Sequence, residues 1–104
     1  MLAQVVGHPV FCTQGKDGIL LCSPGSSAGV PVDSYRATGP IDTVGAGDST
    51  SAGITCAVAA GASYEQAAAF GCLVASITIQ QIGTTGTASP EQVRQRWREV
   101  RPSA

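Results

Sequence analysis

Residues 42 to 48, Asp-Thr-Val-Gly-Ala-Gly-Asp, constrain this chain more than any other stretch. Gly45, Ala46 and Gly47 leave the backbone almost bare just before an Ala-, Gly-, Ser- and Thr-rich segment that is typical of a helix. Consecutive amides at such a corner can converge on a small anion. The acidic side chain of Asp48 would repel that anion. It is useful there if it takes a proton from a nucleophile that then attacks phosphorus.

The heptapeptide resembles the signature of the ribokinase/pfkB family of carbohydrate kinases, Asp-Thr-x-Gly-Ala-Gly-Asp, and has every fixed position of it. The resemblance implies that ATP, with Mg²⁺, donates its γ-phosphoryl group to a hydroxyl of a sugar or sugar phosphate. It also implies that Asp48 is the base and that the amides of Gly45, Ala46 and Gly47 form the anion hole. From the residues alone, Asp48 is equally explained as the N-cap of the following helix.

A second glycine turn, at residues 13 to 18, resembles the family's Thr-x-Gly-x-x-Gly turn, which approaches the phosphates and ribose of ATP. The resemblance makes Thr13, Gly15 and Gly18 nucleotide-binding residues, together with Gly47 of the signature. The two glycines of the turn are also what any tight hairpin favours.

A monovalent cation such as K⁺ is implied beside the nucleotide, held by Asp42 and the carbonyl group of Val44. The alternative is that Asp42 only caps the loop by accepting backbone N–H bonds. The rest of such a cation site would lie near Thr78, Gly83 and Thr87, where this sequence departs from the ribokinase pattern.

Cys72 stands where many family members have an asparagine near the adenine, so we expect an altered contact with the base. The stretch from 80 to 87 resembles the corresponding stretch of the heptose-phosphate kinases of lipopolysaccharide biosynthesis. This likeness suggests the branch of the family and does not identify the sugar.

The order of the expected elements is hairpin, strand, glycine loop and three helices. We expect a helix end before Gly7, and then strands at 10–13, 19–22 and 30–36. The next helix runs from the signature to about Ala60, with Gly61 as its cap. Two further helices begin at Ser63 and Ser89. This order resembles the C-terminal part of the ribokinase-like three-layer α/β/α fold. We therefore expect residues 1–104 to form one partial α/β domain, and the sugar-contacting half to lie upstream in a longer protein.

Composition excludes several other functions. Charged residues are 12% of the 104, and the net charge is −1, which argues against a nucleic-acid partner. Four cysteines without Cys-x-x-Cys spacing and one histidine make no zinc pattern, so we expect free core thiols and a cytoplasmic protein. No run is long enough to span a membrane. Lid strands commonly pair in the family, so the resemblance implies a homodimer for the full-length protein. This sequence lacks those strands and does not fix the oligomeric state.

Three other functions compete with the kinase. A dinucleotide-binding Gly-x-Gly-x-x-Gly loop would need glycine at Thr50, and a methyltransferase-like Asp-x-Gly-x-Gly loop fits residues 42 to 47 with one residue too many. The third is a non-catalytic remnant that keeps the kinase shape and at most binds nucleotide.

Overall fold

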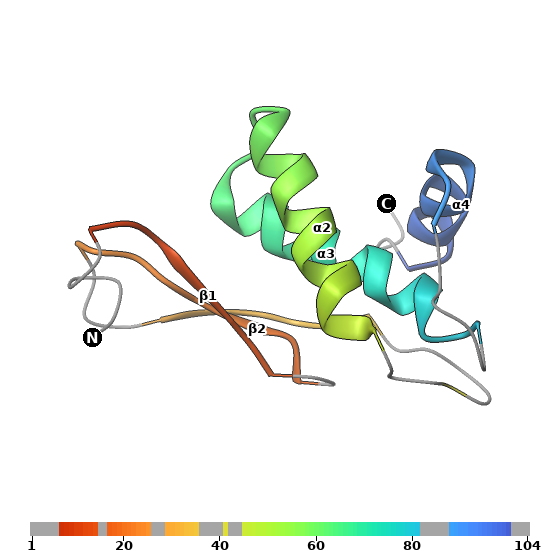
Figure 1. The fold of residues 1–104 in the computed structure, drawn as a ribbon, viewed down its shortest axis with the longest axis horizontal. Coiled ribbons are helices and arrows are strands. Elements are labelled where there is room, and N and C mark those ends of the chain that lie inside the picture. The colour runs from red at the N-terminus through yellow and green to blue at the C-terminus, as the bar shows by residue number, and fades with distance from the viewer. Residues whose placement is uncertain are drawn as a thin grey trace.

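The computed structural model describes residues 7–14, 17–25, 29–35, 41, 45–81 and 88–100. The sequence first forms three short strands, β1 (Val10–Thr13), β2 (Ile19–Cys22) and β3 (Val30–Val32). Three helices follow, α2 (Ala46–Ala59), α3 (Tyr64–Thr78) and α4 (Pro90–Val100). Figure 1 shows the sheet on one side of the molecule, α2 and α3 packed beside each other, and α4 at the far side of α3.

The strands form an antiparallel sheet in the order β1-β2-β3. Phe11 lies opposite Leu21, which in turn lies opposite Val30. The third strand is shorter than the predicted 30–36, because Val32 already pairs with Ile19, the first residue of β2. Beyond that pair the neighbouring chain turns at Gly18, so β2 offers no further ladder partner.

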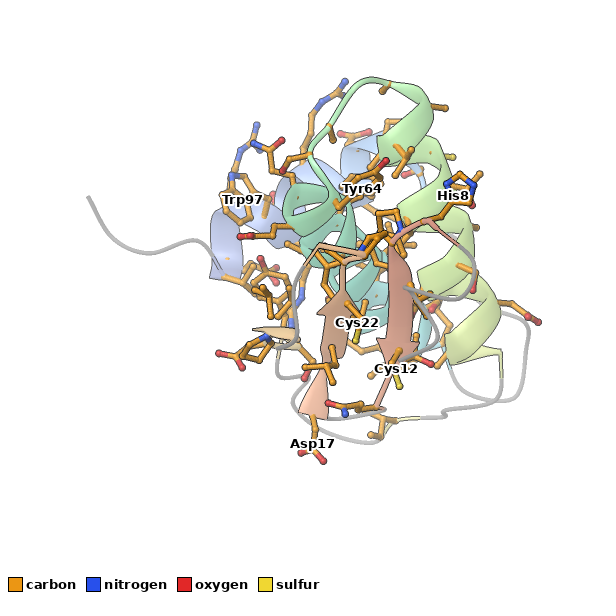
Figure 2. All side chains as sticks on the ribbon, turned by 90° about the vertical axis from the view of Figure 1, so that its left-hand side faces the viewer. His8, Cys12, Asp17, Cys22, Tyr64 and Trp97 are labelled. Carbon is orange, nitrogen blue, oxygen red and sulfur yellow. The ribbon has the colours of Figure 1, made fainter. Side chains whose placement is uncertain are left out.

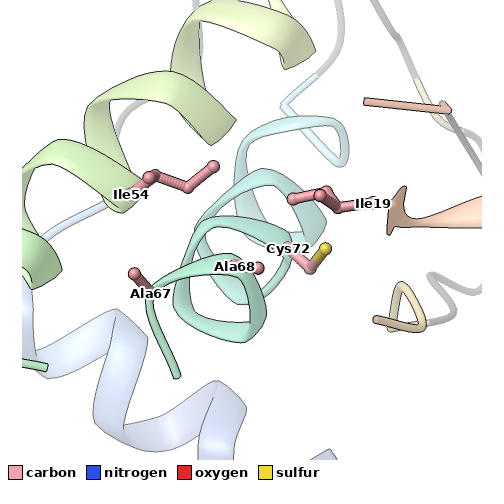
Figure 3. Packing of buried hydrophobic residues seen from close by; sticks show 5 residues of the cluster. All are labelled: Ile19, Ile54, Ala67, Ala68 and Cys72. Carbon is pink, nitrogen blue, oxygen red and sulfur yellow. The ribbon is translucent and has the colours of Figure 1, made fainter. Parts of the chain in front are cut away.

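Helix α3 lies between the sheet and the other helices, as its almost wholly apolar sequence predicts. Figure 3 shows Ala67, Ala68 and Cys72 of this helix between Ile54 of α2 and Ile19 of β2. The core is small in side-chain volume. Ile19 is the largest fully buried side chain among the described residues.

A pair of glycines lets α2 and α3 approach closely. A Cβ added to Gly53 would lie 3.0 Å from the Cα of Gly71, and a Cβ added to Gly71 would lie 2.8 Å from the Cγ1 of Ile54. Neither helix could keep this separation with a side chain at those positions. The small residues of both helices are therefore part of the packing.

The predicted caps are confirmed. The Gln66 amide donates to the Ser63 hydroxyl at 3.1 Å and the Ser63 amide donates to the Gln66 side chain at 3.0 Å, a reciprocal capping box. Ser89 and Gln92 repeat it at the start of α4, at 2.8 and 3.2 Å. Helix α2 is followed by Gly61 in the left-handed region, φ 93°. The expected helix end at residues 1–6 lies outside the described residues.

The prediction that all four cysteines are core thiols is wrong for two of them. All four are free, but Cys12 and Cys56 are exposed, Cys22 is half-buried and Cys72 is buried. Cys12 follows Phe11 on a strand and so faces the opposite side of the sheet. Cys56 lies two residues after buried Ile54, which places it across the helix.

Helix α4 packs only part of its apolar surface against the rest of the described chain. Val93 and Val100 are half-buried, but Trp97 is 43% exposed. The Arg96 side chain is only 13% exposed, and its Nε donates to the buried Ser76 hydroxyl at 3.1 Å. None of the described helices is both long enough and apolar enough to cross a membrane.

Candidate active site

The first turn of α2 has amides without an acceptor in their own helix, as an anion site needs. Gly45 is the N-cap residue, in the left-handed conformation with φ 81° and no side-chain cap. The Ser49 amide donates to the Gly45 carbonyl group at 3.1 Å. The amides of Ala46, Gly47 and Asp48 precede this bond, and amides of a first turn have no acceptor within their own helix.

Asp48 is not the N-cap of this helix, so that alternative is wrong. Asp48 lies three residues inside the N-cap, in the first turn, where the helix dipole favours a negative charge. The cap falls on Gly45 because the chain enters the helix through a left-handed residue, which favours glycine. The Asp48 side chain is exposed and does not turn into the interior.

The described residues leave the space beside Gly45 and Gly47 open. A Cβ added to Gly45 or to Gly47 would meet no atom within 4 Å. A small anion could therefore approach the backbone at this point without displacing a side chain of the described residues. Amides, open space and an exposed carboxylate are brought together here by one loop and one helical turn.

The second glycine turn is a tight hairpin between β1 and β2. The Gln14 amide donates to the Gly18 carbonyl group at 2.7 Å, and the Asp17 amide donates to the Gln14 carbonyl group at 3.1 Å. Gly18 is buried with φ 89°, and its Cα faces the backbone of residues 32–34. Figure 2 shows Asp17 at the tip of this hairpin.

The hairpin tip and the start of α2 lie toward the same end of the molecule in both views (Figures 1 and 2). Thr13, the last residue of β1, is exposed beside the turn. The glycine at position 18 is fully explained by the hairpin, since only glycine fits its conformation and its contact. Gly15 lies outside the described residues, and nucleotide binding by this turn stays a prediction.

Cys72 lies in the core, 6% exposed, rather than on an open surface. Burial raises the pKa of its thiol, and the negative charge of Asp33 raises it further. Burial also raises the pKa of Tyr35, and the Cys72 thiol adds to that shift. Tyr35, in the segment that follows β3, packs against the core cluster that includes Cys72, and the contact of Cys72 with adenine stays a prediction.

Asp42 and Val44, the expected cation ligands, lie outside the described residues. Among the residues that are described, no group of three or more His, Cys, Asp and Glu side chains could hold a metal ion. The cation site stays a prediction.

A hollow of the described surface lies elsewhere, between the end of α3 and α4. It encloses about 580 Å³ and is lined by residues that include Ile77, Gln80, Gln92, Arg96 and Glu99. Arg96 is fixed at its wall by the Ser76 hydroxyl and by the Glu99 carboxylate, each at 3.1 Å. None of its lining residues belongs to the first turn of α2, so the geometry at Asp48 is the better candidate for chemistry.

Comparison with known proteins identifies the family. The pfkB family carbohydrate kinase model matches residues 1–92. The chain belongs to the pfkB family of carbohydrate kinases. Among curated proteins, this pfkB chain is 36% identical over 85 residues to the bifunctional protein HldE of Desulfatibacillum aliphaticivorans. That match covers 80% of the chain and 17% of HldE.

Solved structures confirm the ribokinase-like α/β fold. The ribokinase of Thermotoga maritima superposes with a TM-score of 0.78 at 23% identity, over 88% of the pfkB chain and 30% of that ribokinase. The ribokinase of Arabidopsis thaliana, solved with ribose and ATP, gives 0.77 at 26% identity, over 85% of the pfkB chain and 28% of its own length. The chain thus spans less than a third of these relatives.

Proposed function

We propose that this pfkB chain supplies the phosphoryl-binding and base-bearing part of an ATP-dependent kinase for a sugar or sugar-phosphate hydroxyl. One observation carries the proposal. The first-turn amides of α2 have no helical acceptor and border open space, and the exposed carboxylate of Asp48 belongs to the same turn.

The proposed chemistry follows from this arrangement. The first-turn amides of Ala46 and Gly47, together with the amide of the N-cap Gly45, hold the γ-phosphoryl oxygens while the acceptor oxygen forms its bond to phosphorus and the bond to the ADP oxygen breaks. The acceptor proton passes to Asp48. In a loose phosphoryl-transfer transition state little covalent work falls to the protein, so positioning and charge stabilisation supply most of the rate.

ATP is the proposed donor, as the family and the Arabidopsis relative solved with ATP support. We propose that Thr13, Gly15 and Gly18 approach its phosphates and ribose, and that Cys72 lies on the adenine side. Mg²⁺ would neutralise phosphate charge when bound, and Asp42 with the Val44 carbonyl group would hold a monovalent cation. The first-turn amides, and the space that the described residues leave open at Gly47, fit a phosphate group.

The acceptor is left as a class. The 36% identity with HldE supports the expected likeness to heptose-phosphate kinases, and we propose a phosphorylated sugar as the first acceptor to test. We propose residues 1–104 as one part of a pfkB domain, with the sugar-selecting side chains in the remainder.

A second function remains open, that of a non-catalytic relative that at most binds nucleotide. Titration calorimetry with ATP, with and without Mg²⁺, distinguishes a nucleotide-binding protein from an inert one.

The kinase proposal is tested by ADP release in the full-length gene product, with ATP and a panel of sugars and sugar phosphates. We expect release that depends on one acceptor and is lost in Asp48→Asn. Nucleotide binding without any acceptor-stimulated release would favour the non-catalytic alternative. Equal release by Asp48→Asn and the parent protein would remove Asp48 from the mechanism.

A further inference from the structure

We propose that Thr50 is a positioning residue for the anion hole, because its hydroxyl fixes the direction of the Gly47 amide. The proposal rests on the proposed function, since it takes the first-turn amides of α2 to bind a phosphoryl group. Thr50 belongs to neither glycine turn, and the signature that marks the family ends two residues before it.

The contact that carries this inference is one hydrogen bond. The Thr50 Oγ1 donates to the carbonyl oxygen of Ala46 at 2.9 Å. That carbonyl group belongs to the same planar trans peptide unit as the Gly47 N–H, and the two point in opposite directions. A contact that holds the Ala46 oxygen therefore also aims the Gly47 amide.

Within α2 the Ala46 carbonyl oxygen is the i→i−4 acceptor of the Thr50 amide, so the Thr50 hydroxyl adds a second bond to the same oxygen. The N-cap, Gly45, has no side chain to accept a bond from the first turn, and a Cβ at Gly47 would meet no atom within 4 Å. First turns fray unless a cap or a tertiary contact fixes them. The hydroxyl of Thr50 supplies such a contact one turn further along.

Thr50 is itself fixed by the packing of α2 against α3. The residue is 8% exposed. A Cβ added to Gly71 of α3 would lie 3.3 Å from the Thr50 Cγ2 atom and 2.8 Å from the Thr50 carbonyl oxygen. The hydroxyl therefore belongs to a residue that the core holds in place. Its bond to the Ala46 oxygen ties the first turn to that residue.

Thr55 provides a matched comparison on the same helix. Its Oγ1 donates to the Ser51 carbonyl oxygen at 2.8 Å, with the same spacing of four residues, but Thr55 is exposed and lies mid-helix. Such back-bonding is common for helical threonines and by itself indicates no function. The difference for Thr50 is that the carbonyl group it holds is paired with an amide of the candidate anion hole.

The test uses the full chain and inorganic phosphate as the probe. Amide chemical shifts of Gly45, Gly47 and Asp48 are followed by NMR during a phosphate titration, in the parent chain, Thr50→Val, Thr50→Ser and Thr55→Val. Circular dichroism melting checks each variant. If Thr50→Val does not fold, Thr50→Ala compared with Thr50→Ser isolates the hydroxyl.

We expect saturable shifts in the parent chain and phosphate binding weakened about three- to tenfold in Thr50→Val, the size of one lost hydrogen bond. Thr50→Ser keeps the hydroxyl and should bind within about twofold of the parent, and Thr55→Val should match the parent. Unchanged binding by a folded Thr50→Val would overturn the role of Thr50 alone. Absence of any shift in the parent chain would overturn the anion hole itself.

Discussion

Gly71 of α3 lies so close to Thr50 of α2 that a Cβ on the glycine would stand 2.8 Å from the threonine carbonyl oxygen. This contact joins the centre of the helical packing to the helix that begins at the candidate anion hole. The site therefore depends on the core as well as on its loop. Predictions for the two can be separated because the residues involved are different.

Gly71→Ala tests the helix packing. The added methyl group would meet the Thr50 carbonyl oxygen and the Ile54 side chain, each at 2.8 Å, and one of these atoms is backbone. We expect the free energy of unfolding in urea to fall by about 1 to 3 kcal/mol. Gly25→Ala is the control, because nothing lies within 4 Å of that Cβ. Equal stability of the two variants would contradict the close packing.

Gly18→Ala tests the hairpin. Alanine there would be strained at φ 89° and would also meet the backbone of residues 32–34. Gly61→Ala is the matched control, with φ 93° and open space around it. We expect the control to lose about 1 to 2 kcal/mol from strain alone. Gly18→Ala should lose clearly more free energy of unfolding in urea than the control. Similar losses in the two variants would mean that the contact with the backbone of residues 32–34 does not destabilise Gly18→Ala.

Asp48→Asn separates catalysis from folding. Removal of the proposed base should lower kcat of the full-length gene product by about 10² to 10⁴, the usual contribution of general base catalysis. The melting temperature should change little, because Asp48 is exposed. Glu65→Gln is the control, an exposed acidic residue in the first turn of α3. A comparable loss of kcat in the control would show that first-turn charge in general is responsible.

Cys72 should make stability depend on pH in the alkaline range. Its folded pKa is raised by burial and by Asp33, so the folded chain keeps the proton that the unfolded chain loses. The contribution to stability is full below the ordinary thiol pKa of about 8.5 and declines as pH rises above it. We expect a shallower alkaline loss of unfolding free energy in Cys72→Ala than in the parent.

Cys12→Ala is the comparison for that pH series, since Cys12 is exposed. Its alkaline stability curve should run parallel to that of the parent chain. Tyr35 also has a raised pKa, so some alkaline loss should persist in Cys72→Ala. Identical slopes in Cys72→Ala and the parent would show that the Cys72 thiol is not held neutral by the fold.

Local interactions made much of this structure predictable. The capping boxes at Ser63 and Ser89 and the glycine after α2 act within three or four residues, so the sequence pattern is sufficient for them. The same holds for the hairpin at Gly18. The helix was expected to follow the glycine corner, with Asp48 as an alternative N-cap, but α2 begins at Ala46 and its N-cap is Gly45.

The sequence alone determined the family, the order of the elements and a bare backbone corner beside a carboxylate, because these depend on neighbouring residues. Tertiary structure decided which side chains face the core. In the folded chain Cys56 and Trp97 are exposed, and Arg96 donates a hydrogen bond to the buried Ser76 hydroxyl. Thr50 is buried against Gly71. Those outcomes depend on which helix face meets another element. That choice is set by packing between segments far apart in the chain, and it leaves no trace in local spacing.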